Sequence, residues 1–205
     1  MPSIFINYRT ADSLPTATLI DRDLCARFGA EEVFRAGRSI KGGTRFSEEI
    51  RRALRKCDVL LALIGAKWLD ARTPDGRRAL DDETDWVRSE IMEAFGYGLT
   101  VIPVLLDQTP RLRKGDVPDA LDELLARQTF SLNHRDPDHD LDRIAQRIVE
   151  EVPALGGRRI LSGRRGNGPA APETLRGNLF LGRTTVEGDA VGGDKHVWGT
   201  GERHE

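Results

Sequence analysis

The sequence is short of several features that would each point to a particular class of protein. Of its 205 residues only two are cysteines, and aromatic residues make up 6%. Its 31 lysines and arginines nearly balance its 33 aspartates and glutamates, which gives a net charge of -2. Two cysteines cannot supply a disulfide framework, and no dense basic stripe provides the electrostatic footprint of a nucleic-acid-binding protein. No apolar run reaches the length that a membrane-spanning helix requires.

These absences favour a cytoplasmic location without a membrane or nucleic acid as partner. Cys25 and Cys57 lie far apart within helix-like segments and are expected to be reduced, packed thiols. The first residues enter a strand-like run directly, without the basic and apolar segments of a secretory leader. Aspartates 81 and 82 precede a helical pattern, where they serve as capping residues rather than metal ligands. No metal site is therefore predicted.

The first three quarters of the chain alternate strand-like and helix-like segments. The expected strands are residues 4–8, 32–34, 59–64, 100–106 and 129–132. The expected helices are residues 14–28, 46–56, 84–97, 118–127 and 141–152. This alternation predicts an α/β domain with a five-stranded parallel sheet and helices on both faces, because parallel strands need crossover connections. The segments 59–64 and 101–106 are almost entirely apolar, which indicates central strands buried on both faces.

The composition changes after residue 152. More than half of all the glycines fall in the last quarter of the chain. Residues 153–177 are typical of a flexible linker, so most of the tail is expected to be disordered. Residues 178–205 contain valine-x-glycine-aspartate units that favour short β-arcs. This segment is a candidate for amyloid-like assembly or for recruitment of a partner protein.

Four motifs occur in an order that resembles the Toll/interleukin-1 receptor (TIR) domain family in its bacterial form. FINYR at residues 5–9 is similar to the first sequence box, and EVFRAGRSIKGG at 32–43 to the second strand and its assembly loop. CDVLLALIGAKWL at 57–69 is similar to the third strand, and DWVRSEI at 85–91 to the helix that carries the catalytic glutamate of NAD-cleaving members. The resemblance covers about residues 1–152. It implies a flavodoxin-like strand order of 2-1-3-4-5 and self-association through TIR domains. One departure is Ala36, where relatives often have an aspartate.

Glu90 is the candidate catalytic residue. It follows Trp86 by four residues on the expected helix, so the two side chains share a face beside the apolar stripe. The spacing alone favours an exposed glutamate paired with a basic residue, and it is the resemblance that implies catalysis. A single carboxylate suits NAD+ cleavage, because nicotinamide is already a cationic leaving group and the transition state resembles an oxocarbenium ion. NAD+ would be the substrate, and no cofactor is expected.

The candidate binding residues lie near strand ends. Trp68 and Trp86 could stack on a planar ring, and the alternative for Trp68 is core packing. Tyr8 and Arg9 follow the first strand and could meet the adenine or diphosphate portion, and the alternative for Arg9 is an ion pair. Phe34, at the end of the second strand, completes the candidate set.

Other functions of the same fold class meet specific obstacles. A response-regulator receiver needs an aspartate at the end of its third strand, where this chain has Gly65. A dehydrogenase needs G-x-G-x-x-G after the first strand, which is missing. A nucleoside deoxyribosyltransferase-like enzyme remains possible. The main interpretation is an NAD+ nucleosidase in signalling or defence that is activated by self-assembly, and its main rival is a non-enzymatic TIR adaptor.

Overall fold

A computed structural model of the chain describes residues 2–39 and 46–157. Most of the glycine-rich assembly loop and the whole C-terminal segment at 178–205 lie outside the described residues. Five parallel strands form one sheet in the order β2-β1-β3-β4-β5. This confirms the predicted flavodoxin-like α/β fold, including the strand order that the sequence alone did not show.

The helices and strands follow the predicted alternation. The strands are β1 (Ile4–Asn7), β2 (Val33–Phe34), β3 (Val59–Ile64), β4 (Thr100–Leu106) and β5 (Phe130–Leu132). The main helices are α1 (Thr10–Phe28), α3 (Phe46–Leu54), α4 (Trp86–Gly96) and α6 (Pro137–Glu151). Shorter helical segments are α2 (Ala36–Ser39), η1 (Ala79–Asp81), η2 (Asp119–Leu121), α5 (Asp122–Leu125) and α7 (Pro153–Gly156).

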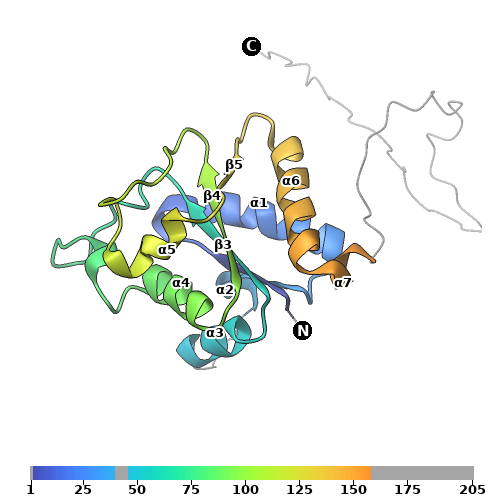
Figure 1. The fold of residues 1–205 in the computed structure, drawn as a ribbon, viewed down its shortest axis with the longest axis horizontal. Helices are drawn as coiled ribbons and strands as arrows, with labels where there is room; N and C mark the ends of the chain where they lie inside the picture. The colour runs from blue at the N-terminus through green and yellow to red at the C-terminus, as the bar shows by residue number, and fades with distance from the viewer. Residues whose placement is uncertain (1, 40–45, 158–205) are drawn as a thin grey trace, which may run out of the picture. The chain divides into compact units, whose positions relative to one another are not determined.

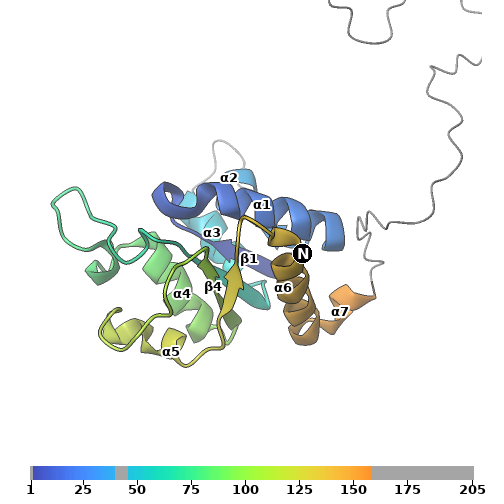
Figure 2. The same cartoon turned by 90° about the horizontal axis from the view of Figure 1, so that it is seen from above.

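Two apolar layers cover the sheet, one on each face. Alternate strand residues point in opposite directions, so β1 contributes Ile4 and Ile6 to one layer and Phe5 to the other. Helices α1, α6 and α7 close the first layer, and α3, α4 and α5 close the second. Figure 1 shows these two groups of helices, and Figure 2 shows β4 between α4 and α6. The central strands are buried on both faces, as their apolar sequences predicted.

Several predicted boundaries were wrong for local reasons. Helix α1 begins at Thr10 rather than at residue 14, and Pro15 lies inside it, where its ring nitrogen cannot donate to the carbonyl of Ala11. The expected helix 118–127 is instead a 3₁₀ turn followed by a single α-turn. The acid that caps α4 is Asp85, which accepts a hydrogen bond from the Arg88 backbone N–H, while the preceding Asp82 binds Thr84. Beyond residue 152, α7 adds Leu155 to the apolar layer.

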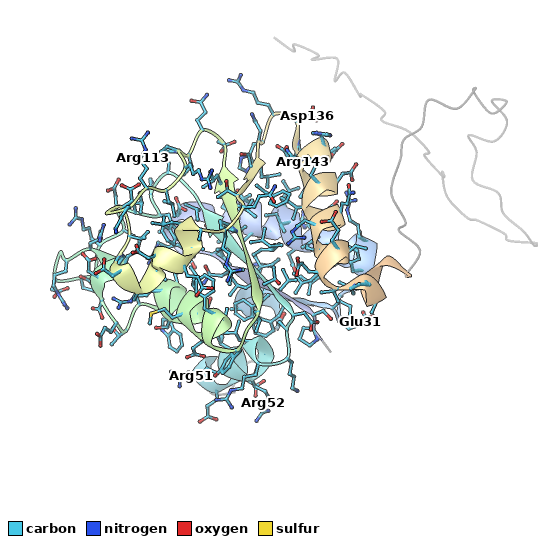
Figure 3. All side chains as sticks on the ribbon, viewed as in Figure 1. Glu31, Arg51, Arg52, Arg113, Asp136 and Arg143 are labelled. Atoms are coloured by element: carbon cyan, nitrogen blue, oxygen red, sulfur yellow. The ribbon has the colours of Figure 1, made fainter. Side chains whose placement is uncertain are left out.

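Charged side chains are spread over the surface. Arg51 and Arg52 extend from α3 and Arg113 from the loop after β4, and all three are exposed (Figure 3). Within residues 2–39 and 46–157, no helix combines the length and the apolar character needed to cross a membrane. In sheets of this kind the loops after the parallel strands meet at the carboxyl edge, so a ligand site is expected there.

Candidate active site

A cleft of about 900 Å³ opens where β1 ends and α4 begins. Its floor and walls include residues from the β1–α1 turn, from α2, from the loop before α4 and from α4 itself. The residues that carry its chemistry are Tyr8, Arg9, Asp85, Trp86 and Glu90. The sequence folds this way because β1 ends on polar residues at the carboxyl edge of the sheet and α4 packs back against it. Residues 80 positions apart in the chain thereby face one cleft.

Glu90 lies one turn into α4, partly buried in the wall of the cleft. One of its oxygens, Oε2, accepts a 2.7 Å hydrogen bond from Nδ2 of Asn7. Asn7 is the last residue of β1 and is completely buried. Burial raises the pKa of the Glu90 carboxyl group to about 8, the Asn7 hydrogen bond acts in the opposite direction, and the charges of Asp85 and Glu93 add to the rise. A carboxyl group with a displaced pKa in a cleft is a candidate functional group.

A buried ion pair joins the two elements that form the cleft. Arg9 donates to both oxygens of Asp85, at 2.9 and 3.0 Å, and the two side chains are only 13% and 9% exposed. Because Asp85 also caps α4 through the Arg88 backbone N–H at 2.9 Å, the pair fixes the start of the helix against the end of β1. Arg9 thus forms the ion pair that was the alternative to ligand binding, but this pair is largely buried and its two residues line the cleft.

Two aromatic side chains border the cleft. Trp86 is the first residue of α4 and is 44% exposed, one turn before Glu90. Tyr8 follows β1. A Cβ at Gly37 would lie 3.2 Å from the hydroxyl oxygen of Tyr8, so a glycine at this position allows α2 to approach the tyrosine closely. The cleft therefore combines a partly exposed tryptophan with a carboxyl group one turn away on the same helix.

The structure does not bring Trp68 and Phe34 into the cleft. Trp68 is 0% exposed. The backbone N–H of Trp68 donates to the Gly65 carbonyl and closes the turn after β3, and this turn directs the indole into the apolar layer with α4. Phe34 is 7% exposed and stacks on Phe5 with ring centroids 5.1 Å apart. The prediction that these two rings meet a ligand is not met by this arrangement, and core packing explains both.

Sequence reasoning missed four residues of the site. Asn7 and Asp85 hold Glu90 and Arg9 in place. Arg72 and Arg77, from the loop between β3 and η1, add cations to the cleft wall. A polar residue that ends an otherwise apolar strand was the available signal for Asn7. No comparable signal marked the arginines, because their position depends on how a long loop folds back.

A second cavity of about 630 Å³ lies at the carboxyl ends of β3, β4 and β5. In it the Thr16 hydroxyl is 2.8 Å from Nε2 of His134, and Nδ1 of His134 is 2.8 Å from Asp107. The His134 hydrogen bonds hold the pKa of the Asp107 carboxyl group below its ordinary value. The carboxylate of Asp12 accepts the backbone N–H groups of Gly65 and Lys67 at 2.9 and 2.8 Å.

The described residues contain no group of three or more His, Cys, Asp or Glu side chains placed to share a metal ion. The fold and the cleft define a doubly wound α/β domain with a desolvated carboxyl group at the edge of its sheet. The chain matches the family model of the TIR domain over residues 4–148, and it therefore belongs to the TIR domain family.

Two solved structures are similar to this chain. The TIR domains of the activated Roq1 resistosome, which directly recognises the pathogen effector XopQ, align with a TM-score of 0.52 at 14% identity, over 72% of this chain and 99% of that one. The TIR domain of the Toll-related receptor TRR-2 from Hydra magnipapillata aligns at 16% identity with a TM-score of 0.35, over 73% of this chain and 96% of that one. No curated protein matches the sequence. At these identities the Roq1 likeness shows the fold alone.

Proposed function

We propose that the protein is an NAD+ nucleosidase that releases nicotinamide by hydrolysis or cyclisation of NAD+ and acts in signalling or antiviral defence. The observation that carries the proposal is Glu90, a carboxyl group in the wall of a 900 Å³ cleft, with its pKa raised to about 8 by burial. It stands beside the accessible indole of Trp86. The TIR resemblance of the DWVRSEI segment supports the same residue.

The reaction needs little more than a well-placed negative charge. The bond between the ribose C1′ and the nicotinamide nitrogen breaks, and its electron pair leaves with nicotinamide, which becomes neutral. Positive charge then develops on C1′ and the ring oxygen, where the carboxylate of Glu90 stabilises it. In hydrolysis a water oxygen bonds to C1′ and releases a proton; in cyclisation an adenine nitrogen takes the place of water. No general acid is required.

The raised pKa suits a cationic substrate. In the free protein at neutral pH the Glu90 carboxyl group is mostly protonated. A cationic nicotinamide ring within a few ångströms favours the ionised form, so substrate binding promotes loss of that proton. The charge is thus created next to the group that it stabilises. The value of kcat/KM should accordingly rise with pH and level off above about 8.

The remaining cleft residues suit the rest of the dinucleotide. Trp86 offers a face on which a planar ring can stack. Tyr8 and Arg72 offer hydrogen-bond donors to the adenine and diphosphate portions, whereas Arg77 is already paired with Asp75 and Asp82. Arg9 serves mainly to hold Asp85, because both oxygens of that carboxylate accept from it.

Self-association through the TIR domain is part of the proposal. The aligned Roq1 TIR domains belong to a resistosome, and a head-to-tail contact of identical domains produces open assemblies. If activity depends on assembly, its rate rises more steeply than linearly with protein concentration. The rival function is a non-enzymatic adaptor that signals by contact between TIR domains. Such an adaptor does not require Glu90 to line a cleft.

The test is release of nicotinamide from NAD+ over a range of protein concentrations, with and without a crowding agent. We expect Glu90→Gln to lower the rate at least about a hundredfold, because it removes transition-state charge stabilisation while it keeps the shape of the side chain. Glu150→Gln is the matched control, since it removes a carboxylate of α6 that pairs with Arg147 and does not line the cleft. A Glu90→Gln variant that cleaves NAD+ at the normal rate excludes Glu90 from the mechanism.

A further inference from the structure

Asn7 makes two hydrogen bonds with the same nitrogen. Its Nδ2 donates to Oε2 of Glu90 at 2.7 Å and to the backbone carbonyl of Val87 at 3.2 Å. The residue is 0% exposed at the end of β1, so water does not compete for either bond. Its Oδ1 is buried and accepts no hydrogen bond within residues 2–39 and 46–157. An orphaned buried amide oxygen is costly, so the orientation of this amide needs an explanation.

The Val87 carbonyl supplies that explanation. An amide could in principle turn over and present its oxygen to a protonated Glu90. In that orientation, however, Oδ1 would face the oxygen of Val87, and two acceptors would oppose each other at about the distance of the present bond. Val87 is the second residue of α4, so its carbonyl is held by the helix and cannot turn away. The main chain of α4 thus permits Asn7 to act only as a donor toward Glu90.

The two oxygens of Glu90 are therefore not equivalent. Oε2 is occupied by Asn7. Oε1 has no hydrogen bond among the described residues and is not one of the fully buried polar atoms without a partner, so it is open to the cleft that Glu90 lines. When the carboxyl group is protonated, the proton belongs on Oε1, because Oε2 already faces a donor.

We propose that Asn7 is a positioning residue that holds Oε2 of Glu90 and leaves Oε1 as the oxygen that faces the substrate. The proposal rests on the NAD+ nucleosidase function and adds to it a division of roles within one carboxyl group. Oε1 releases its proton to solvent water as the cationic ring binds and then faces the developing charge on the ribose. The Asn7 hydrogen bond keeps the carboxylate in one orientation and assists its ionisation.

The direct test measures the carboxyl group itself, without substrate. The ¹³C resonances of the glutamate carboxyl carbons are followed against pH in the full-length protein, and the signal that disappears in Glu90→Gln is the one from Glu90. Asn7→Ala removes the donor, so we expect the Glu90 midpoint to move to higher pH by about one unit. Asn7→Asp keeps the shape and replaces the donor by an acceptor, so its midpoint should move further in the same direction.

Catalysis provides the second measurement. We expect Asn7→Ala to lower kcat about tenfold or more, with less than about a threefold change in KM, and to shift the pH profile by the same amount as the carboxyl midpoint. Asn133→Ala is the matched control, because Asn133 lies by the second cavity and its side chain accepts only the Arg135 N–H among the described residues. Both readouts should be unchanged in it.

The outcomes separate this proposal from the proposed function. An unchanged Glu90 midpoint in folded Asn7→Ala and Asn7→Asp overturns the positioning role, whatever the activity. A shifted midpoint in a protein that releases no nicotinamide supports the positioning of the carboxyl group and rejects the nucleosidase. Circular dichroism identifies any variant that fails to fold, and Asn7→Asp is nearly isosteric, so it remains informative if Asn7→Ala unfolds.

Discussion

The two cavities at the carboxyl edge of the sheet differ in the hydrogen bonding of their polar groups and in the direction of their carboxyl pKa shifts. In the second cavity, His134 is hydrogen-bonded through both ring nitrogens, and the pKa of the Asp107 carboxyl group is lowered by that contact. In the α4 cleft, burial raises the pKa of Glu90, and Oδ1 of Asn7 and Nε of Arg9 are buried without partners among the described residues. Buried polar atoms without partners also occur away from this cleft, as at Trp68 and Arg127, so the raised pKa of Glu90 is what distinguishes it.

The comparison also explains the role of Gly65. A Cβ at this position would lie 2.5 Å from Oδ2 of Asp12, which accepts the Gly65 backbone N–H. Glycine thus allows a carboxylate from α1 to close the end of β3. The position where a receiver domain would have its phosphorylated aspartate therefore lies here against Asp12 by the second cavity, whereas the candidate catalytic carboxyl group lies on α4.

The largest effect on stability is expected from breaking the buried ion pair of the cleft. Arg9→Ala leaves the carboxylate of Asp85 buried without its partner, and the free energy of unfolding should fall by about 3–5 kcal/mol. Urea denaturation measures this value. Arg52→Ala, which breaks an exposed pair with Glu49 at 65% and 36% exposure, should cost less than about 0.5 kcal/mol.

A double variant sharpens this prediction. Arg9→Leu with Asp85→Ser removes both charges, and the serine retains a capping oxygen for α4. It should recover most of the stability that Arg9→Ala loses, because no uncompensated charge remains. A double variant as unstable as Arg9→Ala would show that the charge of Asp85 is not the cause of the loss.

The next effect is a pH dependence of stability that belongs to Glu90. Its folded pKa of about 8 lies above the ordinary 4.5, so the folded state holds this proton more tightly than the unfolded state. The associated stability is complete below pH 4.5 and is lost as the pH rises through about 8. Between pH 5 and 9, wild type should lose roughly 2–4 kcal/mol relative to Glu90→Gln. Parallel stability curves for the two proteins, measured by urea denaturation, would refute the raised pKa.

A smaller effect than these two is expected in the second cavity. His134→Ala leaves the buried hydroxyl of Thr16 without its partner and should cost about 1–2 kcal/mol. Adding Thr16→Val removes the orphaned hydroxyl and should restore most of that loss. Nicotinamide release should be unchanged in both variants. A loss of activity in folded His134→Ala would instead make the second cavity part of the reaction.

Much of the fold could be predicted because it depends on local patterns. The apolar run 59–64 indicated a central strand, and residues 59–64 of β3 are all buried. The segment 118–127 was harder, because Pro118 and Leu121 suit a helix in sequence while packing on α4 divides it into two short turns. Short elements such as α7 depend on tertiary contacts that no local pattern records.

The candidate site was less predictable because side-chain direction depends on loops. Glu90 and Trp86 could be placed on one helix face from their spacing, and both line the cleft. Trp68 could not be placed, since the turn after Gly65 decides whether its indole faces a ligand or the core. Asn7 was visible as a polar strand end, but its bonds to Val87 and Glu90 join segments 80 and 83 residues apart.

The most direct test of the account compares the two cavities in one assay. Nicotinamide release from NAD+ is measured for wild type, Glu90→Gln and His134→Ala at equal, high protein concentration. The account predicts cleavage by wild type and His134→Ala, and a rate lower by at least about a hundredfold for Glu90→Gln. Equal rates for wild type and Glu90→Gln would contradict it. The absence of nicotinamide from the wild-type reaction, even under crowding, would favour a non-enzymatic TIR adaptor.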